Sequence, residues 1–204
     1  LLTSIAADRQ HAKDKDIIEA RAEEVIDREL GFDPRALVGR RLRVDEVGFE
    51  DPADTWEYIK QQVLSGKLPL LSCLEPSPLK LRFAHLSLQE FLCADKWLKQ
   101  MESGRSDMPK VRECLNDGWW HNSLAMACEG RATLGEELFG SSIDLKLDGL
   151  VGDAALKGVA QTARALPELR SLDLSRNALA GPGSLRFVNN KPEMHIMRVQ
   201  DCCP

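Results

Sequence analysis

The sequence predicts a mostly helical protein of the α/β class that ends in a solenoid of short repeated units. A leucine-spaced skeleton recurs near the end of the chain, and apolar residues earlier in the chain return at helical spacing between Gly and Pro residues. A turn containing Pro and Ser also separates two short apolar runs, which predicts a hairpin within the helical first part.

The recurring skeleton is clearest in residues 169–179, LRSLDLSRNAL, which fit the pattern L-x-x-L-x-L-x-x-N-x-L at every defined position. A shift back by 29 residues places Leu145 on Leu174 and Asp148 on Asn177. Matches at several apolar and turn positions are hard to explain by chance in a Leu-rich chain. The skeleton therefore indicates leucine-rich repeats.

The pattern continues toward the end of the sequence. A shift forward by 25 residues carries the segment 167–169 onto 192–194, and Cys202 then takes the position of Asn177, where the pattern accepts either residue. We therefore predict about three repeats in residues 141–204, the last of them truncated. The positions that define them are Leu145, Asp148, Leu172, Leu174, Asn177 and Cys202.

Each repeat is expected to contain a strand, a turn and a helix. The L-x-L segments predict parallel strands at about 143–145, 172–174 and 197–199, and the Asn177 amide is expected to bond backbone groups of the turn. Apolar residues at helical spacing predict a helix over 153–166, which can bury that face only against a neighbouring unit. Such units resemble the ribonuclease-inhibitor type of leucine-rich repeat, whose strands line a concave protein-binding face.

Residues 1–50 are predicted to form a helix and a loop, and we assign them to no domain. Gly31 and Pro34 end the helix. The four arginines of the following loop could form an anion-binding patch, but the nearby acids favour the alternative of a solvated loop. The apolar stripe of the helix consists of Ile17, Ile18, Ala22, Val25, Ile26 and Leu30, and the arginines are Arg35, Arg40, Arg41 and Arg43.

Residues 51–103 predict a winged-helix-like segment. A helix starts at Pro52, a hairpin turns at 75–78, and a second helix starts at Ser87, which forms a capping box with Glu90. The first helix should bury Trp56, Ile59 and Val63, and the second should bury Leu88, Phe91, Leu92, Leu98 and Met101.

Residues 104–140 predict a helical linker that caps the apolar end of the repeats. Two helices are expected at 109–117 and 119–129, and a capping box of Thr133 and Glu136 opens a third that ends at Gly140. We expect His121 to pack at the end of a helix.

Composition narrows the class of protein. The net charge of −5 argues against a nucleic-acid binder, and the apolar runs are too short to cross a membrane. The six cysteines show no C-x-x-C pair and the chain opens with no secretory signal, which favours reduced core thiols and a cytoplasmic protein. The chain begins with Leu and stops within a repeat, so we expect it to be an internal fragment of a longer protein.

The segment 83–94, FAHLSLQEFLCA, resembles the F-x-H-x-S-x-Q-E-[FY]-x-x-A motif of NACHT-family proteins, the NOD-like-receptor type of nucleotide-dependent switch. The motif closes the winged-helix part of their nucleotide-binding module, and a helical region and leucine-rich repeats follow, as in residues 50–204 here. The resemblance implies a signalling switch in which ADP holds a closed form, ATP opens it, and the repeats inhibit the switch or sense a ligand. It also implies that His85 contacts the ADP phosphate in the intact protein.

The chain contains no G-x-x-x-x-G-K-[ST] segment, so we expect no enzyme activity and no cofactor in this chain. ADP or ATP would bind an upstream nucleotide-binding module of the same protein, and a protein partner would bind the repeat face. His85 either contacts phosphate or packs beneath the helix at the end of a strand. One alternative for the whole chain is a leucine-rich-repeat scaffold without an NTPase. A second alternative, a winged-helix DNA-binding domain, is less favoured, because the helix 88–100 offers only Lys96 and Lys99 as cations.

Overall fold

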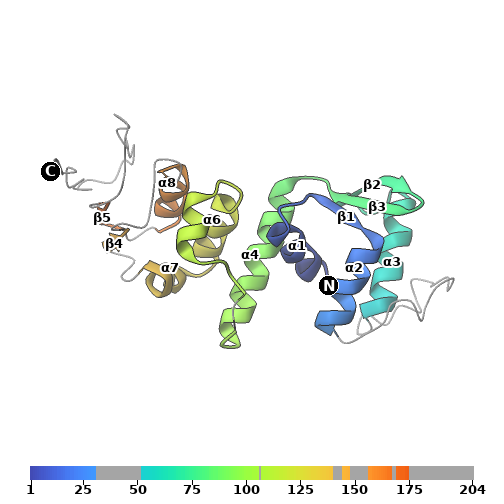
Figure 1. The fold of residues 1–204 in the computed structure, drawn as a ribbon, viewed down its shortest axis with the longest axis horizontal. Coiled ribbons are helices and arrows are strands. Elements are labelled where there is room, and N and C mark those ends of the chain that lie inside the picture. The colour runs from blue at the N-terminus through green and yellow to red at the C-terminus, as the bar shows by residue number, and fades with distance from the viewer. Residues whose placement is uncertain (31–51, 106, 140–143, 148–155, 167–168, 175–204) are drawn as a thin grey trace. The chain divides into compact units, whose positions relative to one another are not determined.

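The structure is a computed structural model that describes residues 1–30, 52–105, 107–139, 144–147, 156–166 and 169–174. The described part is mostly helical and contains one small antiparallel sheet and one pair of parallel strands (Figure 1). The chain divides into two compact units, residues 1–96 and 97–204, and helix α4 contributes residues to both.

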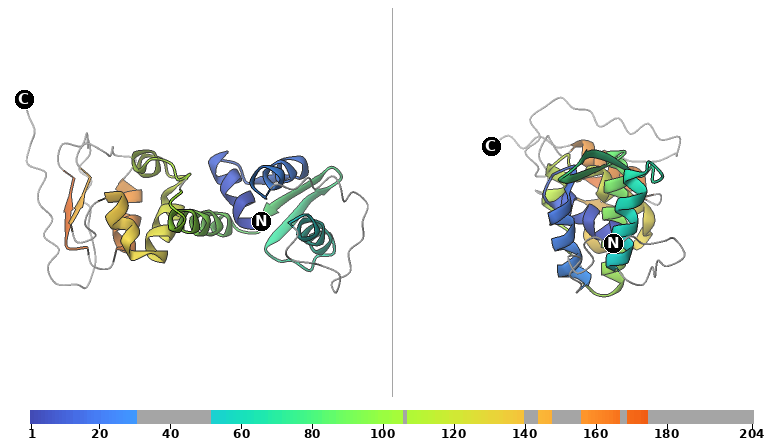
Figure 2. Two further views of the ribbon diagram at one scale, coloured as in Figure 1. Left: turned by 90° about the horizontal axis from the view of Figure 1, so that it is seen from below. Right: turned by 90° about the vertical axis from the view of Figure 1, so that its right-hand side faces the viewer.

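The first unit combines helices with a three-stranded antiparallel sheet in the order β1-β3-β2. In Figure 2 the strands lie against helices of the same unit. Leu81 of β3 lies opposite Ile17 on one side and Cys73 on the other. The elements are α1 (Leu2–His11), β1 (Asp16–Ile18), α2 (Glu19–Leu30), α3 (Pro52–Leu64), β2 (Leu71–Pro76), β3 (Leu79–Phe83) and the first part of α4 (Leu86–Glu102).

One core holds the first unit together, and it draws on both ends of the unit's sequence. The N-terminal residues, which the sequence left unassigned, supply Ile5, Ile17 and Ile26, each no more than 1% exposed. They pack with the predicted core of α3 (Trp56, Ile59, Val63) and with the inward row of β3 (Leu79, Leu81, Phe83). Removal of these side chains from water is the main force that joins residues 1–30 to residues 52–96.

The prediction of a single helix within the first thirty residues is wrong, because the structure has two helices, α1 and α2, with strand β1 between them. Ile17 and Ile18 lie in strand β1, which pairs with β3, and the helix begins only at Glu19. Ile17 is buried at 1% exposure, whereas Ile18 points away from the core and is 47% exposed. This alternation is the period of a strand, and three residues are too few for the sequence to distinguish it from one turn of a helical stripe.

The start of α3 at Pro52 and the hairpin of β2 and β3 agree with the sequence. Helix α4 differs in its cap and in its buried face. It begins at Leu86, and the N–H of Leu88 bonds the carbonyl of His85 at 3.1 Å, so Ser87 lies inside the first turn and does not cap it. Phe91 is 55% exposed, and the buried face instead carries Gln89, Glu90, Cys93, Ala94, Lys96 and Trp97.

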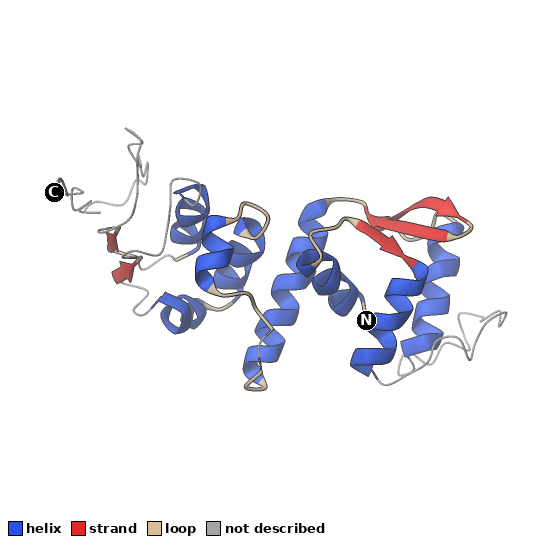
Figure 3. Cartoon of the chain, in the orientation of Figure 1, coloured by secondary structure: helices blue, strands red, loops and turns tan. Residues whose placement is uncertain are grey.

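The described part of the second unit consists of short helices and two short strands. Helices α6 and α7 match the predictions in position. Thr133, however, lies within α7, and its hydroxyl accepts a hydrogen bond from Nε of Arg131 at 2.9 Å. The predicted capping box of Thr133 and Glu136 is therefore also wrong. The elements are the end of α4, α5 (Val111–Asn116), α6 (His121–Gly130), α7 (Ala132–Phe139), β4 (Asp144–Lys146), α8 (Leu156–Ala165) and β5 (Ser171–Asp173), drawn by type in Figure 3.

Strands β4 and β5 pair in parallel, as the repeat pattern predicts, but in a different register. Leu145 lies opposite Leu172, two residues from the expected alignment with Leu174. The N–H of Leu147 bonds the carbonyl of Asp173 at 2.9 Å, and Leu147 is fully buried. The alternation Leu145-Lys146-Leu147 therefore corresponds to Leu172-Asp173-Leu174. The predicted third strand at 197–199 lies outside the described residues.

Candidate functional site

The junction between β3 and α4 carries the motif that the sequence singled out. Strand β3 ends at Phe83, and the N–H of Ala84 bonds the carbonyl of Leu70 at 2.9 Å, which fixes the chain before it turns into the helix. His85 follows and is exposed. The predicted alternative, in which this histidine packs beneath the helix, is therefore wrong, and the imidazole is accessible at the helix N-terminus.

Gln89 fixes the first turn of α4 against the end of α1. Its side chain is 1% exposed, and Nε2 donates at 3.0 Å both to Oε1 of Gln10 and to the carbonyl of Asp14. A buried amide that is bonded in this way holds its neighbours in one geometry, because an unpaired polar group inside the protein is costly. The sequence pattern named Gln89 but could not predict its partners, which lie more than seventy residues away.

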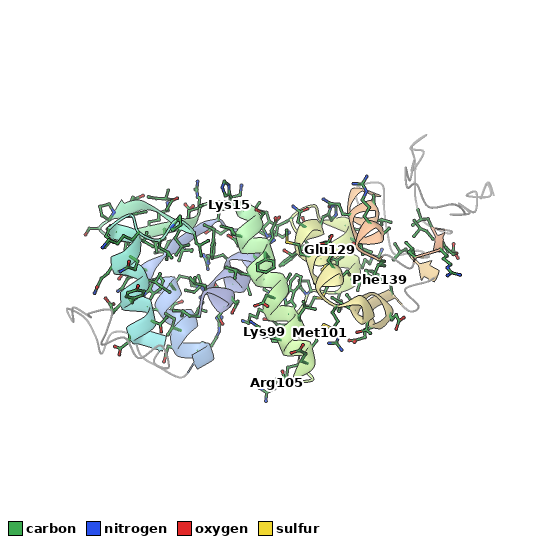
Figure 4. The ribbon with its side chains drawn as sticks, turned by 180° about the vertical axis from the view of Figure 1, so that it is seen from behind. Lys15, Lys99, Met101, Arg105, Glu129 and Phe139 are labelled. Carbon is green, nitrogen blue, oxygen red and sulfur yellow. The ribbon has the colours of Figure 1, made fainter. Side chains whose placement is uncertain are left out.

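A hollow of about 180 Å³ lies beside this turn. Its lining consists of Lys15, Arg82, Phe83, Ala84, Leu86 and Gln89. Figure 4 labels Lys15, which lies on the loop between α1 and β1. His85 is not part of the lining, although both residues that flank it are.

The two cations of the hollow differ in their surroundings. Among the described residues Lys15 forms no ion pair, whereas Nε of Arg82 bonds Oδ1 of Asp16 at 2.8 Å. Nζ of Lys80 lies 2.9 Å from the other oxygen of Asp16. The hydrogen bonds from Lys80 and Arg82 hold the pKa of Asp16 below its ordinary value, and Asp16 in turn raises the pKa of Lys80.

This arrangement favours a negatively charged group. The first N–H groups of a helix have no partners within the helix and carry partial positive charge, and two cationic side chains add to that field. Pockets for whole small molecules usually measure roughly 300–1,000 Å³, so this hollow suits a single phosphate or carboxylate group and not a complete nucleotide. The site can hold or sense an anion, and its described lining contains no Ser, Thr, Cys or His.

The predicted repeat residues lie elsewhere, in the second unit. Leu145 and Leu172 are neighbours in the parallel pair, Leu172 is buried at 8% exposure, and Leu174 is partly buried. The sequence missed Leu147, whose alternation with Leu145 was the available signal. Asp148, Asn177 and Cys202 lie outside the described residues, as do the arginines of residues 35–43.

Helices α6 and α8 pack side by side and run in the same direction. The ring of His121, at the start of α6, contacts Gly158 near the start of α8. One turn further along α8, Nε2 of Gln161 donates to Oδ1 of Asn122 at 2.8 Å. His121 is 3% exposed and its Nε2 lies 2.9 Å from the carbonyl of Leu115, so it is a packing residue, as predicted.

Burial makes two of the described cysteines unsuited to nucleophilic catalysis. Cys93, Cys114 and Cys128 are buried and form no disulfide, and burial raises the pKa of Cys114 and of Cys128 to about 12, which keeps both protonated near neutral pH. Cys73 also forms no disulfide but is exposed, so the expectation that the thiols belong to the core is wrong for this residue. Within the described ranges, no group of His, Cys, Asp or Glu is arranged to hold a metal ion.

None of the described helices is long and apolar enough to cross a membrane. In comparisons with protein-family models, with curated proteins and with solved structures, nothing matches this chain. The geometry of the chain is therefore the basis for a functional proposal.

Proposed function

We propose that this chain is the regulatory and protein-recognition part of a nucleotide-dependent signalling switch of the NACHT and leucine-rich-repeat type. The observation that carries the proposal is the position of the motif 83–94. Its histidine stands exposed where β3 turns into α4, and Gln89 anchors that turn from inside. A residue that senses a phosphate on another module must be both accessible and held in place.

The fold around the motif supports this assignment. Helices α1, α2 and α3 and a three-stranded sheet with a β2–β3 hairpin are consistent with a winged-helix unit. The cationic hollow next to His85 provides a field that favours the phosphate of ADP when an upstream nucleotide-binding module closes on this surface. His85 then stabilises the ADP-bound closed form more than the ATP-bound open form. The buried thiols, which form no disulfide, suit a protein that works in the cytoplasm.

The test is the rate of ADP release from the intact protein that carries the upstream module. His85→Leu removes the donor, and the site is exposed, so little packing is lost. A hydrogen bond to a charged group contributes about 1.5–3 kcal/mol, so we expect ADP release to speed up by about ten-fold or more. His11→Leu, at an exposed histidine on α1, is the control and should release ADP at the original rate. Unchanged release from His85→Leu, at unchanged thermal stability, would contradict the proposal.

A second candidate is a leucine-rich-repeat scaffold that binds a protein partner and has no nucleotide-dependent module. The parallel pairing of β4 with β5, with α8 between them in sequence, favours it. The parallel packing of α6 with α8 also favours it, because stacked repeats place their helices side by side. The two candidates differ in one measurement. The intact protein retains bound ADP on purification under the first and none under the second.

A further inference from the structure

A groove runs between α6 and α8 on the helical side of the second unit. Its volume is about 230 Å³, and it is lined by Asn122, Ala125, Met126, Glu129, Gln161 and Arg164. The groove is smaller than a typical small-molecule pocket and open along its length, so it suits a few residues of a peptide better than a buried ligand. It lies on the helices, whereas the protein-binding face expected of the repeats lies on the strands.

The rim of the groove carries two opposite charges that do not pair with each other. Glu129 lies in the last turn of α6 and Arg164 in the last turn of α8, and both are exposed. Among the described residues neither forms a salt bridge. Figure 4 labels Glu129 on α6. Because adjacent helices lie roughly 8–10 Å apart, the two charges can engage two different side chains of one bound segment.

The floor and one wall of the groove suit an adaptable contact with a peptide. Ala125 and Met126 are partly exposed, and methionine is a flexible side chain that fits varied apolar partners. The wall is fixed by the hydrogen bond from Nε2 of Gln161 to Oδ1 of Asn122.

We propose that this groove binds an extended segment of a protein partner that carries an acidic and a basic side chain. The acidic side chain pairs with Arg164, the basic one pairs with Glu129, and an apolar residue between them covers Met126. This surface differs from the strand face and from the His85 junction, so the proposal holds whether or not the protein binds a nucleotide.

The probe is a displayed library of random linear peptides, selected on the full chain. The selected peptides should contain one acidic and one basic residue a few positions apart. The groove variant Glu129→Lys/Arg164→Glu keeps the net charge and should lower the affinity for these peptides by at least about ten-fold, because each attraction becomes a repulsion. Peptides with the two charges exchanged should bind the groove variant better than the original chain, a gain that a misfolded variant could not produce.

The control is Glu102→Lys/Arg105→Glu, which reverses two exposed charges at the end of α4 and in the turn after it and also keeps the net charge. It should bind the selected peptides with unchanged affinity. The proposal is overturned if the groove variant and the control bind the selected peptides equally well. It is also overturned if selection enriches no peptides with paired charges.

Discussion

The ring of His121 fills the space that a methyl group on Gly158 would need. A Cβ at position 158 would lie 2.8 Å from Cγ of the ring and closer still to Cδ2 and Nε2. The ring cannot move freely, because Nε2 also bonds the carbonyl of Leu115. The absence of a side chain at position 158 therefore allows α8 to pack against the ring at the start of α6.

We therefore expect Gly158→Ala to lower the free energy of unfolding by about 1–2 kcal/mol, since the clash outweighs the gain of roughly 1 kcal/mol that Ala brings to a helix. In a His121→Ala background the same substitution should cost nothing or stabilise, because the ring is gone. Chemical denaturation of the four proteins of this double-mutant cycle measures the difference. An equal loss in both backgrounds would show that the ring does not limit the space.

At the residue scale, the sequence predicted apolar positions better than polar ones. Trp56 and Val63 follow helical spacing, so their burial could be read from the pattern. Gln89 and Ser87 could not be placed in this way. Burial of Gln89 depends on Gln10, and the first turn of α4 starts one residue before the predicted cap. Local spacing contains no information about either cause.

At the element scale, α4 shows how a tertiary partner decides which face of a helix is buried. Its hydrophobic residues predicted Phe91 inside, yet the structure buries Gln89 and exposes Phe91. A tertiary partner also determines the structure of β1, because pairing with β3 holds Ile17 and Ile18 in a strand although their spacing fits the helical pattern. By contrast α3, α6 and the β2–β3 hairpin are bounded by Gly, Pro or a turn, and the sequence predicted them.

The two faces of α4 give a matched pair of substitutions. Gln89→Leu should destabilise the protein by about 1–3 kcal/mol, because it removes the buried donor to Oε1 of Gln10 and to the carbonyl of Asp14. Phe91→Ser should change stability by no more than about 0.5 kcal/mol, as expected for an exposed position. Unfolding midpoints in urea test both. A larger loss from Phe91→Ser would mean that the opposite face of α4 is the buried one.

At the scale of the whole molecule, acid should weaken the first unit through two carboxyl groups. Bonds from Lys80 and Arg82 lower the pKa of Asp16. Burial alone would raise the pKa of Asp8, but hydrogen bonds from Arg21 and Arg9 outweigh it, and the pKa is lowered. Both groups therefore bind a proton more weakly in the folded state than in the unfolded state, where the ordinary value is 3.8.

Their contribution to stability is consequently complete above the unfolded pKa and is lost as the pH falls through 3.8 and then through the lower folded values. We expect the thermal midpoint to fall over this range. Asp16→Asn should lower the midpoint near neutral pH and flatten the acid decline, because one of the two groups no longer titrates. Thermal unfolding followed by circular dichroism at constant ionic strength tests this. Parallel pH profiles for the two proteins would contradict it.

The boundary between the two units falls within α4, and its position determines which fragments of the chain keep this helix whole. The first turn after the helix contains Gly104, with φ of +73°, so a fragment that ends there keeps α4 whole. The remaining fragment then lacks Trp97, whose ring centroid lies 5.7 Å from that of Trp120. A cut between residues 96 and 97 would instead leave each half with an incomplete helix. A recombination that moved one unit alone into another protein would have to supply the missing part of α4. We therefore expect the two units to be exchanged together.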